Sequence, residues 1–156
     1  GGCLAPVNAY LNIIGMETLG LRMERVCNNA FRLAQALEKL EGVSVNYPLL
    51  ESSPYHELAE KQLSGKGGAI LTIRAGSKER AYKLINHLKY VKIATNIGDV
   101  RTLVIHPAST IYIHSTPEAM EEAGVYDDTI RISVGIEDIK DLIQDFTEAV
   151  ESLGEE

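Results

Sequence analysis

The fold of this chain is decided by the stretch TIRISVGIED, residues 129–138. β-branched apolar residues occupy every second position from Ile130 to Val134, and this two-residue period predicts a half-buried strand. The glycine that follows ends the strand. Two acidic residues then begin a helical pattern, since negative charge is favourable at a helix N-terminus. The sequence therefore predicts a strand, a turn and a helix in immediate succession.

Arg131 lies on the polar side of this predicted strand, next to the turn. A guanidinium group forms two parallel hydrogen bonds with a carboxylate or a phosphate, so an arginine here suits an anionic ligand. An exposed ion pair with a neighbouring side chain explains the same residue, because such pairs are common on protein surfaces. These ten residues alone favour the ion pair, and the rest of the chain has to decide.

The composition is that of one globular domain. The 156 residues are 45% hydrophobic and 24% charged, which is enough apolar sequence for one core. The formal net charge of −7 disfavours a nucleic-acid-binding protein, whose surface would be basic. No apolar run reaches the ~20 residues that a membrane span requires. Cys3 and Cys27 form no metal-binding or redox motif, so we expect reduced thiols and a cytoplasmic protein.

A long amphipathic helix is predicted near the start of the chain. Apolar residues recur at spacings of three and four from Met16 to Leu40, and Gly42 provides the stop. A helix of this length overhangs a small domain or reaches towards another one. The preceding residues 1–15 form a mixed lead-in in which we expect Pro6 to prevent a regular helix. Since the chain does not begin with methionine, we also expect a fragment or a processed product.

The remaining sequence alternates between short strands and short helices. An α+β fold is therefore predicted, a two-layer sandwich in which helices cover one face of a small, mostly antiparallel sheet. We expect a tight turn at Gly98-Asp99 between the third and fourth strands. The expected strands are 43–47, 69–74, 89–96, 102–105 and the strand that carries Arg131. The expected helices are 77–88, one starting at 116–118, and 136–153, and residues 54–63 are expected to form a short polar helix or a loop.

Most motifs for catalysis are absent. The four histidines have no metal-ligand spacing, no GxSxG sequence is present, and we expect no metal site. The glycines at 65–68 lack the spacing of a phosphate-binding loop, so a turn leading into a strand is favoured. His106 is interpreted as a hydrogen-bonded structural histidine rather than a base, and Cys27 as a partly buried residue of the long helix.

Anion recognition remains as the function that the residues support. Besides Arg131, the segment from Asn96 to Thr102 contains an asparagine, a glycine and a hydroxyl at a turn between two strands. Both segments could meet at one edge of the sheet. Residue chemistry therefore predicts a site for a small-molecule carboxylate and does not identify the molecule.

Three longer motifs resemble one enzyme family, in order along the chain. Residues 94–110, ATNIGDVRTLVIHPAST, are similar to the signature of O-acetylhomoserine sulfhydrylases, which belong to the pyridoxal-phosphate-dependent transsulfuration family. Residues 15–25, GMETLGLRMER, resemble a helix of that family. Residues 131–137, RISVGIE, resemble its R-x-S-V-G-x-E element.

The resemblance assigns roles to individual residues. It implies that Arg131 grips the α-carboxylate of an amino-acid substrate such as O-acetylhomoserine, and that Thr102 lines the same site. Relatives that make or cleave cystathionine usually carry glutamate at the position of Arg101, so the basic residue favours sulfhydrylation. Asn96 completes the predicted substrate-binding set. Ile111-Tyr112 departs from the Thr-His that usually follows the signature, which leaves the sulfur donor and acyl group open.

The resemblance also implies an arrangement of domains. Residues 1–41 would be the lead-in and inter-domain helix, and residues 42–156 the C-terminal substrate-binding domain of a fold-type I enzyme. The lysine and phosphate-binding residues that hold pyridoxal phosphate would lie in an upstream domain, so the chain alone is expected to be inactive. A full-length cytoplasmic homo-oligomer, a dimer of dimers, is expected. A cystathionine γ-synthase or γ-lyase of the same family, or a non-enzymatic amino-acid-binding module, are the alternatives.

Overall fold

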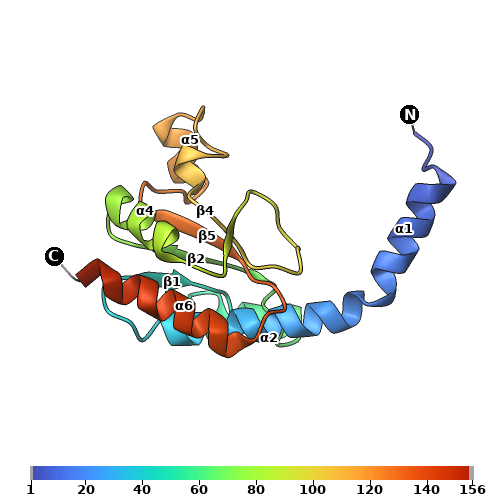
Figure 1. The fold of residues 1–156 in the computed structure, drawn as a ribbon, viewed down its shortest axis with the longest axis horizontal. Helices are drawn as coiled ribbons and strands as arrows, with labels where there is room; N and C mark the ends of the chain where they lie inside the picture. The colour runs from blue at the N-terminus through green and yellow to red at the C-terminus, as the bar shows by residue number, and fades with distance from the viewer. Residues whose placement is uncertain (1, 155–156) are drawn as a thin grey trace.

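The computed structural model describes residues 2–154 and confirms an α+β fold (Figure 1). In the described part of the chain, helical elements come first and last, and the strands lie between them. No helix among residues 2–154 is long and apolar enough to cross a membrane. The elements are α1 Pro6–Glu17, α2 Leu19–Leu37, β1 Ser44–Asn46, α3 His56–Leu63, β2 Ile70–Arg74, α4 Lys78–His87, β3 Lys92–Ile93, β4 Leu103–Ile105, the 3₁₀ turn η1 Pro107–Ser109, α5 Pro117–Glu122, β5 Thr129–Ser133, α6 Ile139–Glu151 and the 3₁₀ turn η2 Ser152–Gly154.

The five strands form one mixed sheet in the order β1-β2-β5-β4-β3. β5, the strand in the deciding stretch, is central and pairs antiparallel with β2 and with β4. In this register Arg131 lies opposite Thr72 on one side and Ile105 on the other. The predicted antiparallel character is confirmed for three of the four pairings, and β3 with β4 is the parallel exception. The strand with Arg131 thus lies at the centre of the fold.

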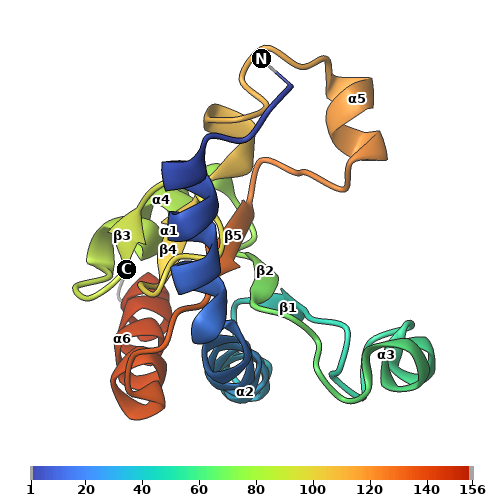
Figure 2. The same cartoon turned by 90° about the vertical axis from the view of Figure 1, so that its right-hand side faces the viewer.

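One apolar layer joins the sheet to three helices. α2, α4 and α6 lie on the same side of the sheet (Figure 2) and bury their apolar faces against the side chains of β2, β4 and β5. Burial of these side chains is the main stabilising contribution in a domain of this size. Fully buried members of this core include Leu33, Leu37, Leu71, Ile73, Leu84, Ile130, Ile132, Leu142 and Phe146.

Local signals in the sequence set the helix starts. The side chains of Ser77, Thr116 and Asp138 accept hydrogen bonds from backbone N–H groups of Arg80, Ala119 and Lys140, respectively. Such N-caps satisfy donors that the first helical turn leaves free. The predicted starts of α4 and α5 are therefore confirmed to within a residue, and α6 begins three residues later than predicted.

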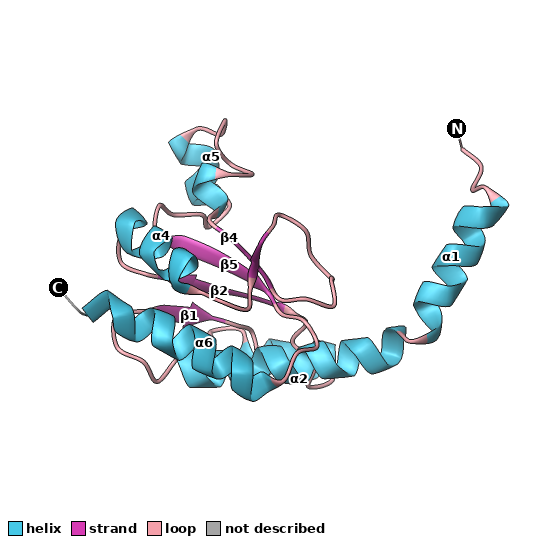
Figure 3. Cartoon of the chain, in the orientation of Figure 1, coloured by secondary structure: helices cyan, strands magenta, loops and turns pink. Residues whose placement is uncertain are grey.

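The predicted single helix from Met16 to Leu40 is wrong. The chain forms two helices that break at Thr18, and Figure 3 shows the non-helical link between α1 and α2. Pro6 does not prevent a helix but lies in the first turn of α1, where its missing N–H costs nothing. No residue of α1 is buried, and the helix extends away from the sheet (Figure 1).

The predicted strand 89–96 shrinks to the two residues of β3. β3 runs parallel to β4, so Gly98-Asp99 does not form the tight turn between adjacent strands that we expected. A parallel pair needs a longer connection. Residues 94–102 provide it, and we call this segment the 94–102 loop. Gly98 has a positive φ of 76° within it, a conformation that favours glycine.

The prediction that β5 is half-buried is also wrong. Its burial is nearly complete: Ser133 on the expected polar face is only 1% exposed, and its Oγ accepts a hydrogen bond from the N–H of Gly98 in the 94–102 loop. Arg131 alone among the five residues of β5 is partly exposed. The alternation in the sequence therefore located the core-facing side chains correctly but did not reveal what covers the other face.

Candidate functional site

Arg131 is held between the strand and the 94–102 loop. Its Nη2 donates a hydrogen bond to the carbonyl oxygen of Thr95 at 2.6 Å, and the carbonyl oxygen of Asn96 is 3.5 Å away. Its Nε is buried and has no hydrogen-bond partner among the residues that the structure describes. A buried N–H of a charged group without a partner is costly. The guanidinium is thus oriented by one carbonyl, and its buried Nε has no acceptor among these residues.

The 94–102 loop is attached to β5 and the turn after it by two further contacts. The backbone N–H of Gly98 donates to Ser133 Oγ at 3.2 Å, and the N–H of Ile136 donates to the carbonyl of Val100 at 2.9 Å. The predicted meeting of these two segments is confirmed. It involves the central strand of the sheet, however, and not an outer edge.

Thr102 is fully buried and its hydroxyl has two internal partners. Oγ1 donates to Glu137 Oε2 at 2.8 Å and accepts from the N–H of Gly135 at 2.9 Å. The backbone N–H of Thr102 donates to the other carboxylate oxygen of Glu137. The structure therefore places Thr102 beneath the site, as a support for the turn at 135–137. Its predicted role in lining a substrate pocket stays a prediction.

Asn96 and Arg101 are exposed on the 94–102 loop. The backbone of Arg101 is fixed by its N–H, which donates to Asp99 Oδ1 at 2.9 Å, but its side chain has no hydrogen bond or ion pair among residues 2–154. Asn96 is adjacent to the carbonyl that orients Arg131. Among the described residues, the loop thus presents a cationic side chain and an amide without hydrogen-bond partners beside the held guanidinium.

Gly135 permits the close approach of the loop to the turn. A Cβ at this position would lie 2.3 Å from the carbonyl oxygen of Val100 and 2.6 Å from the carbonyl carbon of Arg101. Both are backbone atoms, which cannot move aside cheaply. Any side chain here would push the 94–102 loop away from the strand that carries Arg131.

Two residues of the site were not singled out by sequence reasoning. Glu137 was interpreted as part of a helix start and as the last residue of the R-x-S-V-G-x-E element, without a role in the site, and Asn29 was not considered. Asn29 is buried, and its Nδ2 donates to the carbonyls of Gly135 and Glu137 at 3.0 and 2.9 Å. The available signal was a polar residue in an apolar helix face, since a buried amide needs partners.

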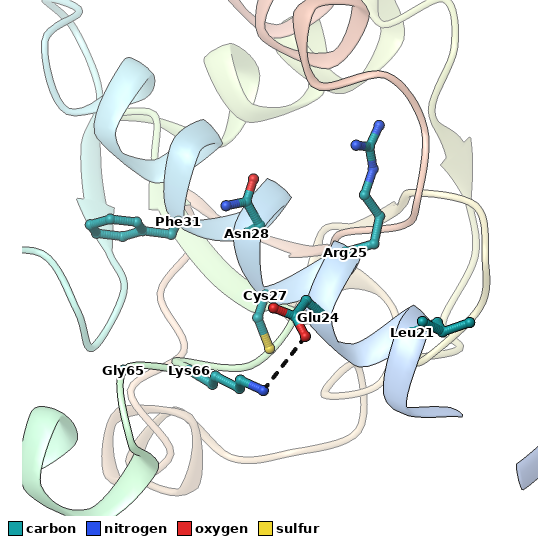
Figure 4. A pocket seen from close by; sticks show the side chains of 8 residues that line it. All are labelled: Leu21, Glu24, Arg25, Cys27, Asn28, Phe31, Gly65 and Lys66. Carbon is teal, nitrogen blue, oxygen red and sulfur yellow. Dashed lines mark ion pairs between the residues drawn. The ribbon is translucent and has the colours of Figure 1, made fainter. Parts of the chain in front are cut away.

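A cavity of about 480 Å³ lies elsewhere, between α2 and the turn at Gly65-Lys66 (Figure 4). Lys66 Nζ is 4.0 Å from Glu24, and both side chains are mostly exposed, so this pair contributes little. Arg25 points away from Lys66 and Cys27 in Figure 4. None of the four predicted site residues lines this cavity. Its size alone gives no reason to prefer it to the surroundings of Arg131.

The structural interpretation of His106 is confirmed. The ring is buried, with Nδ1 2.9 Å from Ser109 Oγ and Nε2 2.6 Å from the carbonyl of Asp127. Cys27 is buried more completely than expected, at 7% exposed, and Cys3 is exposed. Within residues 2–154, no group of three or more His, Cys, Asp or Glu side chains is placed to hold a metal ion.

Comparison with known proteins yields a family and several relatives. The model of the family described as "Cys/Met metabolism PLP-dependent enzyme" matches residues 1–151. Homocysteine synthase of Schizosaccharomyces pombe is 46% identical over 153 residues, which cover 97% of this chain and 36% of the relative. O-acetyl-L-homoserine sulfhydrylase 1 of Thermus thermophilus is 43% identical, with 96% and 36% covered. An L-methionine gamma-lyase of Fusobacterium nucleatum is 40% identical, with 98% and 39% covered.

The solved structures that match include one described as an O-acetylhomoserine (thiol)-lyase. A Campylobacter jejuni structure that contains a pyridoxyl-lysine monophosphate matches with a TM-score of 0.91 and 37% identity. The match covers 97% of this chain and 36% of that one. This chain therefore spans somewhat more than a third of the length of the relatives it matches.

Proposed function

Because this chain belongs to the Cys/Met metabolism family of pyridoxal-phosphate-dependent enzymes, we propose that it is the substrate-binding part of an O-acetylhomoserine sulfhydrylase. Its reaction would be a γ-replacement, in which acetate leaves O-acetylhomoserine and sulfide or a thiol takes its place. In this proposal Arg131 binds the α-carboxylate of the substrate, and the exposed side chains of Asn96 and Arg101 flank it.

The observation that carries this proposal is the partly exposed guanidinium of Arg131, which forms no ion pair with a carboxylate among residues 2–154. Its Nη2 is held by the carbonyl of Thr95, while its buried Nε has no partner among residues 2–154. A carboxylate is a strong acceptor, and charge-assisted hydrogen bonds to guanidinium are short and directional. An amino-acid carboxylate would accept from the accessible part of this guanidinium and compensate its charge, since no carboxylate of the described residues does so.

Arg131 would act by orientation. Holding the carboxylate fixes the rotation of the substrate about its α-carbon, and correct orientation can contribute a large part of a rate enhancement. When pyridoxal phosphate is bound, it supplies the electron sink that such chemistry requires. Every lysine in residues 2–154 is exposed or half-buried, so these residues fit the substrate better than they fit the attachment of the cofactor. We propose that another part of the protein holds the cofactor and that this chain alone is inactive.

Arg101 favours a sulfhydrylase over the alternatives in the family. An acidic residue at this position could bind a second amino group of a longer substrate, such as the one in cystathionine, whereas a cation repels it. The exposed side chain of Arg101, which forms no ion pair within residues 2–154, is available to exert this selection. Because relatives named as gamma-lyases are nearly as similar as the sulfhydrylases, a γ-lyase is the second candidate. A cystathionine γ-synthase and a non-enzymatic binding module are less well supported.

The exposed apolar helix α1 supports a further partner, the cofactor domain. Val7, Tyr10, Leu11, Ile13 and Met16 are all more than half exposed, which is unusual for so many large apolar side chains on one helix. The relatives are more than twice as long as this chain, so their additional length could cover such a helix. We propose that α1 packs against the pyridoxal-phosphate domain of a full-length homo-oligomer, a dimer of dimers, in the cytoplasm.

Product analysis tests the proposed reaction. The full-length protein, loaded with pyridoxal phosphate, would be mixed with O-acetylhomoserine and sulfide. Formation of homocysteine and acetate without ammonia supports γ-replacement. Release of ammonia and a 2-oxo acid from a thioether amino acid, with no homocysteine formed, would replace the proposal by γ-elimination.

The predicted inactivity of the chain alone needs its own experiment. The 156-residue chain would be incubated with pyridoxal phosphate, reduced with borohydride and measured by mass spectrometry. We expect only scattered, substoichiometric labelling of exposed lysines. A single adduct at one lysine with full occupancy would contradict the proposal that the cofactor is held elsewhere.

A further inference from the structure

The side chain of Glu137 is turned back from its helix towards the 94–102 loop. Its Oε2 accepts from the hydroxyl of Thr102 at 2.8 Å, and its Oε1 accepts from the backbone N–H of the same residue. The hydroxyl in turn accepts from the N–H of Gly135 at 2.9 Å. These three hydrogen bonds form a closed ring between the start of β4 and the turn that follows β5, and every donor in the ring has an acceptor.

The backbone at Glu137 is fixed from the opposite side by α2. The carbonyl oxygen of Glu137 accepts from Asn29 Nδ2 at 2.9 Å and from Arg25 Nη2 at 3.1 Å. Asn29 also donates to the carbonyl of Gly135 at 3.0 Å. The turn therefore has little freedom to rotate, and the carboxylate of Glu137 is presented to Thr102 in one orientation.

Glu137 is not needed to begin α6. Asp138 is the N-cap of that helix, and its Oδ1 accepts from the N–H of Lys140 at 2.8 Å. An acidic residue before an N-cap could contribute only a weak charge effect there. Both oxygens of Glu137 are instead hydrogen-bonded to Thr102, so its role must be sought in what Thr102 holds.

What Thr102 holds is the end of the loop that flanks Arg131. Arg101 directly precedes Thr102, and the start of the loop is bound through Thr95 to the guanidinium. The ring at Glu137 and the contact at Arg131 thus fix the two ends of one loop against the same strand and turn. If the ring opens, the loop end with Arg101 can move relative to Arg131, and the distance between the two cationic groups is no longer defined.

We propose that Glu137 is a positioning residue for the carboxylate site, acting through Thr102 on the 94–102 loop. This inference rests on the proposed function, because it assumes that Arg131 binds the substrate. It adds that the affinity for the amino-acid substrate depends on a carboxylate that does not touch the substrate. The geometry also explains why a glycine is required at position 135, since the ring closes directly over it.

Hydrogen exchange in the 156-residue chain tests the ring without any cofactor. Glu137→Gln keeps an acceptor for the N–H of Thr102 but places an amide N–H₂ against its hydroxyl, and Glu137→Ala removes both acceptors. We expect the amides of Thr102 and Gly135 to exchange at least about tenfold faster in Glu137→Ala, because local opening becomes easier. Amides in the middle of α6 should exchange as in the wild type. Glu148→Gln, which removes an exposed carboxylate from α6, is the matched control.

Kinetics of the full-length, cofactor-loaded protein test the consequence. We expect Glu137→Ala to raise the KM for O-acetylhomoserine about tenfold and Glu137→Gln to raise it less, with kcat changed by less than about threefold. Glu148→Gln should leave both constants unchanged. Thr102→Val should raise KM as Glu137→Gln does, Thr102→Ser should retain the wild-type value, and the Glu137→Gln/Thr102→Val double variant should show less than the sum of the two effects.

The outcomes separate the inference from the proposed function. Faster exchange at Thr102 with an unchanged KM would overturn the inference, since the ring would then be only structural. Unchanged exchange would overturn it as well. A raised KM in Arg131→Ala alongside a wild-type KM in Glu137→Ala would leave the proposed function intact and refute the positioning role. An unchanged KM in Arg131→Ala would refute the proposed function itself.

Discussion

Helix α1 and strand β5 are both rich in large apolar residues, but their environments are opposite. In β5, Ile130 and Ile132 are 0% exposed, because strands on both sides and helices on one face cover them. In α1, Tyr10 and Leu11 are 63% and 59% exposed, and the helix touches little besides α2. Both elements therefore have apolar side chains that burial would stabilise. Within the described residues, only those of β5 are buried.

The difference has a physical consequence for how each region contributes. Buried apolar side chains stabilise the fold in proportion to the area removed from water, and exposed ones contribute almost nothing. The half of α2 that follows Val26 belongs to the core, while its first turns share the exposure of α1. Stability should therefore be concentrated in the sheet and its helices, and α1 should be open to a partner.

The largest effect is expected from a truncation in the core. Leu33→Ala on α2 should lower the free energy of unfolding by about 2–5 kcal/mol, because it leaves a cavity at a fully buried position. Leu11→Ala on α1 should change it by less than about 0.5 kcal/mol. Urea unfolding of both variants measures the contrast. Equal destabilisation by both variants would show that α1 is packed in solution. It would contradict the difference in burial between α1 and the core.

A second contrast compares two glycines. Gly135→Ala should cost about 1–3 kcal/mol, because its Cβ would collide with backbone atoms of the 94–102 loop. Gly15→Ala in α1 meets nothing within 4 Å and should cause no loss of stability, since alanine favours a helix. Thermal unfolding followed by circular dichroism distinguishes them. A Gly135→Ala variant as stable as the wild type would mean that the loop is not held as described.

Local signals in the sequence were sufficient to predict the elements that are buried within this chain. The strands at 70–74, 103–105 and 129–133 and the caps of three helices follow from period and side-chain chemistry, which act over a few residues. The break at Thr18 was missed because the apolar period continues through it. The spacing of apolar residues indicates which side of a helix is buried. It does not indicate whether the helix axis breaks.

The segments that form the site could be predicted from the sequence, but the hydrogen bonds that hold them together could not. The sequence indicated that Arg131 and the segment at 96–102 could meet, which the structure confirms. It could not indicate that Glu137 binds Thr102, 35 positions away, because such a pair depends on the pairing of β4 with β5. It also could not reveal the parallel direction of β3, which depends on a loop without a regular pattern.

The smallest expected effect concerns acid. The hydrogen bond from Lys89 holds the pKa of Glu148 on α6 below its ordinary value. A carboxyl group with a lowered pKa in the folded state stabilises above its unfolded pKa, and the contribution is lost as pH falls through the folded value. Glu148→Gln should therefore reduce the decrease in Tm between pH 7 and pH 3 slightly. An unchanged decrease would mean that the bond does not persist in solution.

The account depends most on Arg131, and one measurement tests it directly. In the full-length, cofactor-loaded protein, Arg131→Ala should raise the KM for O-acetylhomoserine about 10- to 100-fold, equivalent to the ~1.5–3 kcal/mol of a charged hydrogen bond. The KM of Arg131→Lys should lie between those of the wild type and Arg131→Ala, because an ammonium group keeps the charge but cannot form two parallel hydrogen bonds. A KM for Arg131→Ala that equals the wild-type value would contradict the assignment of the carboxylate site.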